Sequence, residues 1–147
     1  MSENERVEKA VALFKEGYSC SQAVVGAYCE RFDLDKETAI KLSAGFGGGM
    51  KMAGTCGALT GGFMIIGLKH GHSEAEDKEG KKRLGALIKD FTARFKKRAG
   101  SLTCRELMNC DISTEEGLRL ANETDLFSVV CPKAVRAAAE ILEEMLF

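Results

Sequence analysis

Cysteine is the residue type in this chain best suited to redox or metal chemistry, and the 147 residues contain six of them. They are Cys20, Cys29, Cys56, Cys104, Cys110 and Cys131. The chain begins with polar residues and lacks the apolar segment of a secretory signal, so we expect a cytoplasmic protein. In a reducing compartment, cysteines serve as metal ligands, catalytic thiols or small buried side chains more often than as structural disulfides.

Four of the six cysteines lie where the sequence predicts the start of a helix. Cys20, Cys56 and Cys104 each follow a serine or threonine that can cap a helix, and Cys131 precedes Pro132, a residue favoured at the first helical position. Free backbone N–H groups at a helix start stabilise a thiolate or an anionic sulfur ligand, so we expect at least one of these thiols to have a lowered pKa. Cys29 and Cys110 lie away from helix starts, and we interpret both as structural or incidental.

The elements that must position these cysteines are predicted to be helices. Apolar residues recur at helical spacing, and capping patterns such as Ser19–Gln22, Ser73–Glu76 and Thr103–Glu106 mark helix starts. The first four expected helices are residues 4–16, a segment from Ser19, a segment after Asp33 or Asp35 that ends at Gly45, and residues 55–68 capped by Thr55. The remaining ones are a segment from Ser73 that ends before Gly100, a short segment from Thr103, and a last helix that Pro132 opens.

A glycine-rich stretch separates the third and fourth expected helices. Residues 45–54 contain five glycines, a density that predicts a loop lying close to other groups. Gly57, Gly61 and Gly67 in the following helix leave room for close helix packing. The sequence has no convincing strand pattern or internal repeat, so we expect residues 1–147 to form one all-α domain, a bundle of six or seven helices.

The segment Cys56–Gly61 reads CGAxxG, with one cysteine upstream and two downstream. In length and order the chain resembles the family of small redox-active proteins defined by the pattern Cys, CGAxxG, Cys, Cys. The resemblance implies a redox role and identifies Cys20, Cys56, Cys104 and Cys131 as the four cysteines of the family. A looser similarity connects the motif to the iron–sulfur part of split-Soret cytochromes.

Two redox mechanisms are open. In the first, Cys20, Cys56, Cys104 and Cys131 ligate an iron–sulfur cluster, most simply 2Fe–2S, and the protein carries electrons. In the second, two or more of them cycle between dithiol and disulfide, with Cys56 as the attacking thiol. There are two non-redox alternatives: the four cysteines form a structural zinc site, or the cysteines are inert buried side chains. The closely spaced cysteine pairs that are usual in zinc sites are absent from the sequence. Whether the protein is an oxidoreductase or only an electron carrier stays open.

Composition argues against several other functions. The formal net charge is −1, which does not suggest nucleic-acid binding. The longest apolar stretch, residues 56–68, is too short to span a membrane. We expect no c-type haem because no C-x-x-C-H occurs, and no nucleotide because the glycine-rich stretch lacks a following Gly-Lys-Ser/Thr.

Partners are predicted from two features. Residues 81–98 carry eight basic side chains and one acidic one, so this helix could dock a redox partner protein. A homodimer is expected from the general frequency of two-fold assemblies.

His70 and His72 lie at an expected helix end, and we interpret both as solvated.

Overall fold

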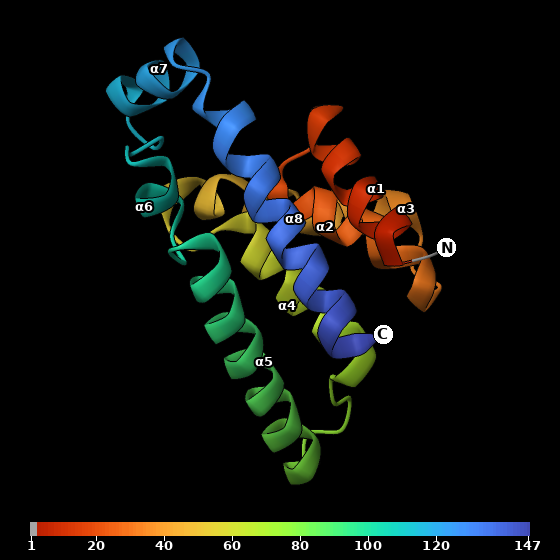
Figure 1. The fold of residues 1–147 in the computed structure, drawn as a ribbon. Coiled ribbons are helices and arrows are strands. Elements are labelled where there is room, and N and C mark those ends of the chain that lie inside the picture. The colour runs from red at the N-terminus through yellow and green to blue at the C-terminus, as the bar shows by residue number, and fades with distance from the viewer. Residues whose placement is uncertain (1–2) are drawn as a thin grey trace.

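Eight α-helices build residues 3–147, which are the residues that this computed structural model describes (Figure 1). They are α1 (Glu3–Lys15), α2 (Cys20–Tyr28), α3 (Lys36–Ser43), α4 (Gly57–His70), α5 (Lys78–Ala99), α6 (Cys104–Met108), α7 (Glu115–Glu123) and α8 (Leu126–Leu146). Three shorter helical segments are η1 (Cys29–Phe32), η2 (Ala44–Phe46) and η3 (Gly49–Ala53). The all-α prediction is confirmed, with α7 in addition to the helices expected.

Local capping explains several helix starts. The Ser19 side chain accepts a hydrogen bond from Gln22 N, and the Gln22 side chain accepts one from Ser19 N at 3.0 Å, which is the predicted capping box of α2. Asp35 accepts from Thr38 N at 3.0 Å at the start of α3. Thr103 accepts from Glu106 N at 3.2 Å, but the Glu106 carboxylate accepts from Ser101 Oγ instead of closing a box.

Three predicted helix starts are wrong. Cys56 itself, not Thr55, is the N-cap residue of α4, because Thr55 pairs with Thr103 in an isolated antiparallel bridge. Helix α5 begins at Lys78 and is capped by Asp77, which accepts from Gly80 N at 2.8 Å, rather than by Ser73. Helix α8 begins at Leu126, six residues before Pro132.

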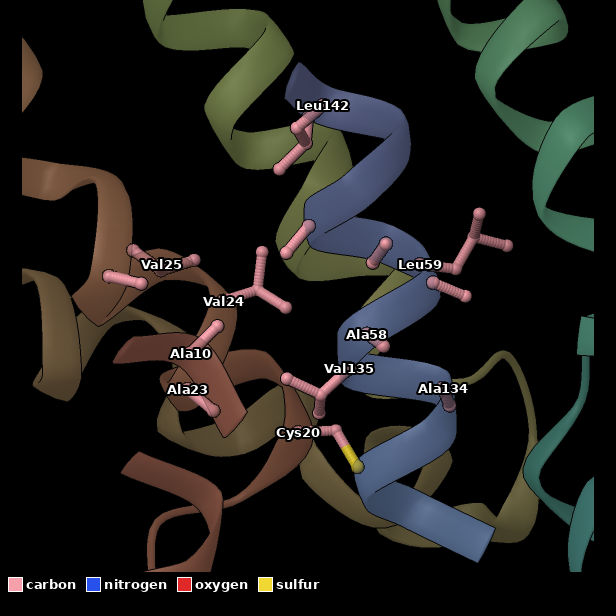
Figure 2. Packing of buried hydrophobic residues seen from close by; sticks show 14 of the residues in the cluster. Ala10, Cys20, Ala23, Val24, Val25, Ala58, Leu59, Ala134, Val135 and Leu142 are labelled. Carbon is pink, nitrogen blue, oxygen red and sulfur yellow. The ribbon is translucent and has the colours of Figure 1, made fainter. Parts of the chain in front are cut away.

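The core lies around α8, which packs against α1, α2, α4 and α5. Figure 1 shows α8 running through the middle of the molecule, with α1 to α3 on one side and α5 on the other. Figure 2 shows side chains of α2 and α8, among them Val24 and Val135, meeting in this core. In the described part of the chain, no helix is both long enough and apolar enough to cross a membrane.

Helices α2 and α4 approach closely because α4 presents glycines to its neighbours. A Cβ atom at Gly61 would lie 3.1 Å from the Ser21 carbonyl oxygen and 3.1 Å from Val24 Cβ. A Cβ at Gly57 would lie 3.2 Å from Cys20 Cβ. The expected role of Gly67 in close packing is wrong, because a Cβ there would meet nothing within 4 Å. The close contact thus forms at the end of α4 that carries Cys56.

Candidate functional site

Four cysteines from four helix regions line one cavity of about 120 Å³. They are Cys20, Cys56, Cys104 and Cys131, the same four that the sequence singled out, and each is at most 9% exposed. The other lining residues are mostly apolar and include Phe14, Met108 and Phe127. The arrangement is therefore a buried group of thiols in an apolar chamber.

Cys20 is the first residue of α2, directly after its cap Ser19. Its side chain extends from α2 toward α8, as Figure 2 shows near Val135. The Cys20 thiol hydrogen-bonds with both Cys131 and Cys56. Cys20, at the start of α2, thus interacts both with the thiol at the start of α4 and with the thiol on α8.

A short backbone pairing brings Cys56 and Cys104 to the cavity. Cys56 N donates to Leu102 O at 2.8 Å, and Cys104 N donates to Gly54 O at 2.6 Å. These two bonds flank the Thr55–Thr103 bridge and join the residues before α4 to those before α6. Sequence reasoning missed this pairing, because two residues of extended chain on each side leave no alternating pattern.

The prediction that Cys131 occupies a helix N-terminus is wrong. Cys131 is the sixth residue of α8, and Pro132 lies inside the helix. Pro132 has no backbone N–H, so it cannot make the bond to the Ser128 carbonyl that a continuous helix would have. Helix α8 begins instead after Asp125, whose backbone is left-handed at φ 55° and whose carboxylate accepts from Ser128 Oγ at 2.9 Å. Packing on the bundle, rather than a helix start, places Cys131 in the cavity.

The cavity thiols differ in acidity. A hydrogen bond from Cys20 lowers the pKa of Cys56 against the opposing effect of burial, helped by the backbone N–H groups of Ala58 and Leu59 at the start of α4. Hydrogen bonds with Cys131 and Cys56, together with burial, raise the pKa of Cys20. Burial raises the pKa of Cys104 to about 12, and the nearby Cys56 and Cys131 add to this shift. The hydrogen bond from Cys20, helped by the N–H groups at the start of α4, thus favours the thiolate at Cys56, whereas burial and neighbouring thiols raise the pKa values of Cys20 and Cys104.

The glycine-rich stretch approaches the cavity as the sequence predicted. Gly48 and Gly49 line the cavity, and a Cβ at Gly49 would lie 2.9 Å from Cys104 Cβ. Both glycines have left-handed backbones, at φ 64° and 62°. Glycine adopts this conformation without strain, and the absence of a side chain lets the backbone lie against Cys104.

The remaining candidates lie outside the cavity. Cys29 is fully buried and its thiol donates to Gly26 O at 3.5 Å, while Cys110 is half-buried after the left-handed Asn109. His70 is the last residue of α4, and His72 is exposed in the loop beyond it. Burial raises the pKa of Cys29, which keeps its thiol protonated.

The basic helix is partly neutralised within the chain. Arg94 pairs with Asp90 at 3.0 Å, and Arg98 pairs with Glu144 of α8 at 2.7 Å. Glu144 also pairs with Arg94 at 3.5 Å. Docking of a partner on residues 81–98 stays a prediction.

The donor set of the cavity is four thiols, which is the usual ligand set of an iron–sulfur cluster. Within residues 3–147, no group of three or more His, Cys, Asp or Glu side chains is arranged to hold a metal ion. A two-iron cluster has a requirement different from that of a single ion, because two protein ligands bind each of its two irons. The four thiols therefore match a two-iron cluster in the number and the chemistry of its ligands. To bind one, the thiols that hydrogen-bond to one another would have to turn toward the irons.

Comparisons with known proteins give one match. The model of a family described as putative redox-active protein (C_GCAxxG_C_C) matches residues 18–145, which include all four cavity cysteines. No curated protein and no solved structure matches the chain. The match covers most of the chain, and the fold brings its four patterned cysteines together in one cavity. The chain therefore belongs to this family of redox-active proteins.

Proposed function

We propose that this protein is an electron carrier in which Cys20, Cys56, Cys104 and Cys131 ligate an iron–sulfur cluster, most simply 2Fe–2S. The observation that carries the proposal is the presence of all four cysteines around one buried cavity. A disulfide needs only two cysteines, whereas a cluster with cysteine ligands needs four. The redox role of the family supports the same class of function.

The surroundings of the thiols suit a cluster ligand set. When bound, the cluster would supply a one-electron redox centre. The backbone N–H groups of Ala58 and Leu59 already favour negative charge on the Cys56 sulfur. Such hydrogen bonds to ligating sulfur raise a reduction potential, while the apolar lining keeps water away from the sulfurs.

The test is anaerobic purification without chelator, followed by a visible absorption spectrum and assays for iron and acid-labile sulfide. We expect visible bands that bleach with dithionite, with about two irons and two sulfides per chain. A colourless protein that takes up neither iron nor sulfide on reconstitution would contradict the proposal. Stoichiometric zinc in a colourless sample would indicate the structural alternative.

A second candidate function, thiol–disulfide exchange, is favoured by the hydrogen bond between Cys20 and Cys56 and by the lowered pKa of Cys56. The Cys56 thiolate would attack a substrate disulfide, whose S–S bond breaks as one substrate thiolate leaves and takes up a proton. The Cys20 thiol would then lose its proton and attack the mixed disulfide, releasing the second substrate thiolate, which is protonated in turn. The two electrons from Cys20 and Cys56 reduce the substrate disulfide to two thiols.

Exposure of the reduced, metal-free protein to oxidised glutathione tests this second function. The expected product is a Cys20–Cys56 disulfide, identified by peptide mass mapping. The Cys131→Ser variant is the matched control, because it removes the other thiol that hydrogen-bonds with Cys20 and should leave this disulfide intact. Cys56 that remains reduced, or is only glutathionylated, would rule out Cys20 as its resolving partner.

A further inference from the structure

The turn beside the cavity contains residues in the left-handed backbone conformation, which residues other than glycine rarely adopt. Met50 and Lys51 have φ 60° and 62°, and they follow Gly48 and Gly49, which have the same left-handed conformation. Gly54 N donates to Gly49 O at 2.9 Å and closes the turn. Residues held in such conformations persist only where the surrounding structure imposes them, and they concentrate at functional sites. The strain at Lys51 is therefore a reason to ask what its side chain does.

The Lys51 ammonium lies at the rim of the cysteine cavity. A Cβ at Gly47 would lie 3.8 Å from Lys51 Nζ, and the same Cβ would collide with Ser19. Ser19, which this Cβ would meet, and Gly48, the next residue along the chain, both line the cavity. The Lys51 ammonium therefore lies near Gly47 and Ser19, next to the cavity lining.

Lys51 carries a positive charge beside this rim. Its side chain is exposed, and it makes no ion pair with any carboxylate in the part of the chain that the structure describes. Arg105, also beside the turn, hydrogen-bonds to Met52 O at 3.5 Å and pairs with Asp111 at 3.4 Å. The charges of Arg105 and Asp111 therefore offset each other, whereas that of Lys51 is free to act on an approaching molecule.

We propose that Lys51 selects negatively charged reactants for the redox centre in the cavity, an inference that rests on the proposed function. The centre, when bound and reduced, would supply one electron to an oxidant that carries negative charge. The oxidant would gain the electron that the centre loses, and no proton or covalent bond would change place. Attraction between the ammonium and the oxidant raises the rate of encounter at the cavity rim.

The test compares two small one-electron oxidants of opposite charge, hexacyanoferrate(III) and hexaammineruthenium(III), with dithionite-reduced protein in a stopped-flow instrument. The variant is Lys51→Asn, because asparagine lacks the charge and tolerates a left-handed backbone, so the fold is retained. At low salt we expect the variant to react about fivefold more slowly with the anion and faster with the cation. The difference should nearly vanish at about 1 M salt, where charges are screened beyond about 3 Å.

Lys78→Asn is the matched control. Lys78 is the exposed first residue of α5, at the end of that helix far from α6 (Figure 1), and it makes no ion pair within the described residues. Its removal changes the net charge equally and should leave the ratio of the two rates unchanged. A change in reduction potential would shift both rates in the same direction, so the ratio isolates electrostatic selection.

The outcomes separate the two claims. An unchanged rate ratio in Lys51→Asn, with the visible bands of the centre intact, would overturn the role of Lys51 and leave the proposed function standing. A protein without a reducible chromophore would overturn both. Acidic plastocyanin and basic cytochrome c, used as protein oxidants, identify the source of the negative charge. Slower reaction of the variant with plastocyanin would support an acidic protein partner, whereas an effect confined to hexacyanoferrate would support a small anionic reactant.

Discussion

The six cysteines occupy three kinds of surroundings. Four line the cavity, Cys29 is sealed in the core against Gly26 O, and Cys110 is half-buried just beyond α6. Cys104 and Cys110 form the best pair for separating these roles, because Cys104 begins the short helix α6 and Cys110 directly follows its C-terminal cap, Asn109. Their sequence separation is six residues, yet only Cys104 reaches the cavity.

Cys104→Ser is expected to lose most of the iron and the visible absorption, because a serine hydroxyl does not replace a thiolate as a cluster ligand. Cys110→Ser serves as the control and should keep both. The measurement is iron and sulfide content with the absorption spectrum of each purified variant. Equal losses in the two variants would contradict the assignment of Cys104 as a ligand.

Tyr28 provides a test by pH. Its buried hydroxyl donates to Ala139 O and to Glu143 Oε1, each at 3.1 Å, while Arg6 lies 6.0 Å from the ring. Burial raises the pKa of Tyr28 well above its ordinary value of about 10, with a further contribution from the Glu143 carboxylate. In the unfolded chain the phenol ionises above about pH 10, whereas in the folded protein it keeps its proton. The free energy of unfolding should therefore fall as the pH rises above about 10.

Urea unfolding of the wild type and Tyr28→Phe at a series of alkaline pH values measures this effect. Phenylalanine does not ionise, so the variant should lose less stability over that range. The difference between the two proteins isolates Tyr28 from Cys104, whose raised pKa acts in the same direction in both. Parallel stability curves would contradict the raised pKa of Tyr28.

At the scale of elements, the glycines of α4 set how closely α2 approaches. Gly61 faces the Ser21 backbone and Val24, whereas Gly67, further along the same helix, faces open space. Gly61→Ala should destabilise the protein by about 1 to 3 kcal/mol, because the added methyl group must push α2 away. Because α2 carries Cys20, this variant should also take up less iron. Urea unfolding and iron analysis measure the two effects.

Gly67→Ala is the matched control on the same helix. It should stabilise the protein by about 0.5 to 1 kcal/mol, since alanine is the better helix former and its methyl group meets no neighbour. Destabilisation of similar size in both variants would mean that α4 does not tolerate alanine for reasons other than its contact with α2.

At the scale of the whole molecule, two ion pairs connect α1 to α8 across most of the chain length. Arg6 binds the buried Glu143 with bonds of 2.6 and 2.9 Å, and Arg136 binds the exposed Glu8 at 2.6 Å. Arg6→Met should destabilise the protein by about 3 to 5 kcal/mol, because it leaves the carboxylate of Glu143 buried without its cation. Urea unfolding measures this loss, which is a large part of the stability of an ordinary domain.

Arg136→Met removes a cation from the same pair of helices and should change the stability by less than about 1 kcal/mol, since the pair is solvated. The comparison separates the effect of burial from that of joining α1 to α8. Losses of equal size would indicate that the connection between the helices, and not the buried charge, determines the result.

The expected homodimer stays a prediction, to be checked by light scattering on the purified protein.

The sequence by itself determined the helical class and which cysteines to examine. Helical spacing of apolar residues and the caps at Ser19, Asp35 and Thr103 depend on interactions within a few residues, so the chain reveals them directly. The CGAxxG segment and the order of the cysteines likewise need no three-dimensional information.

Only the tertiary structure decided how the four thiols meet. The Thr55–Thr103 pairing, the approach of Gly49 to Cys104, and the start of α8 before Pro132 depend on contacts between distant segments. Pro132 favours a helix start when only its neighbours are considered, but the bundle accepts it in the second turn of α8, where Cys131 then reaches the cavity. Helix propensity and capping preferences describe the interactions of a residue with its near neighbours in the chain only. The packing of α8 against the other helices outweighs the loss of the one helical hydrogen bond that Pro132 cannot make.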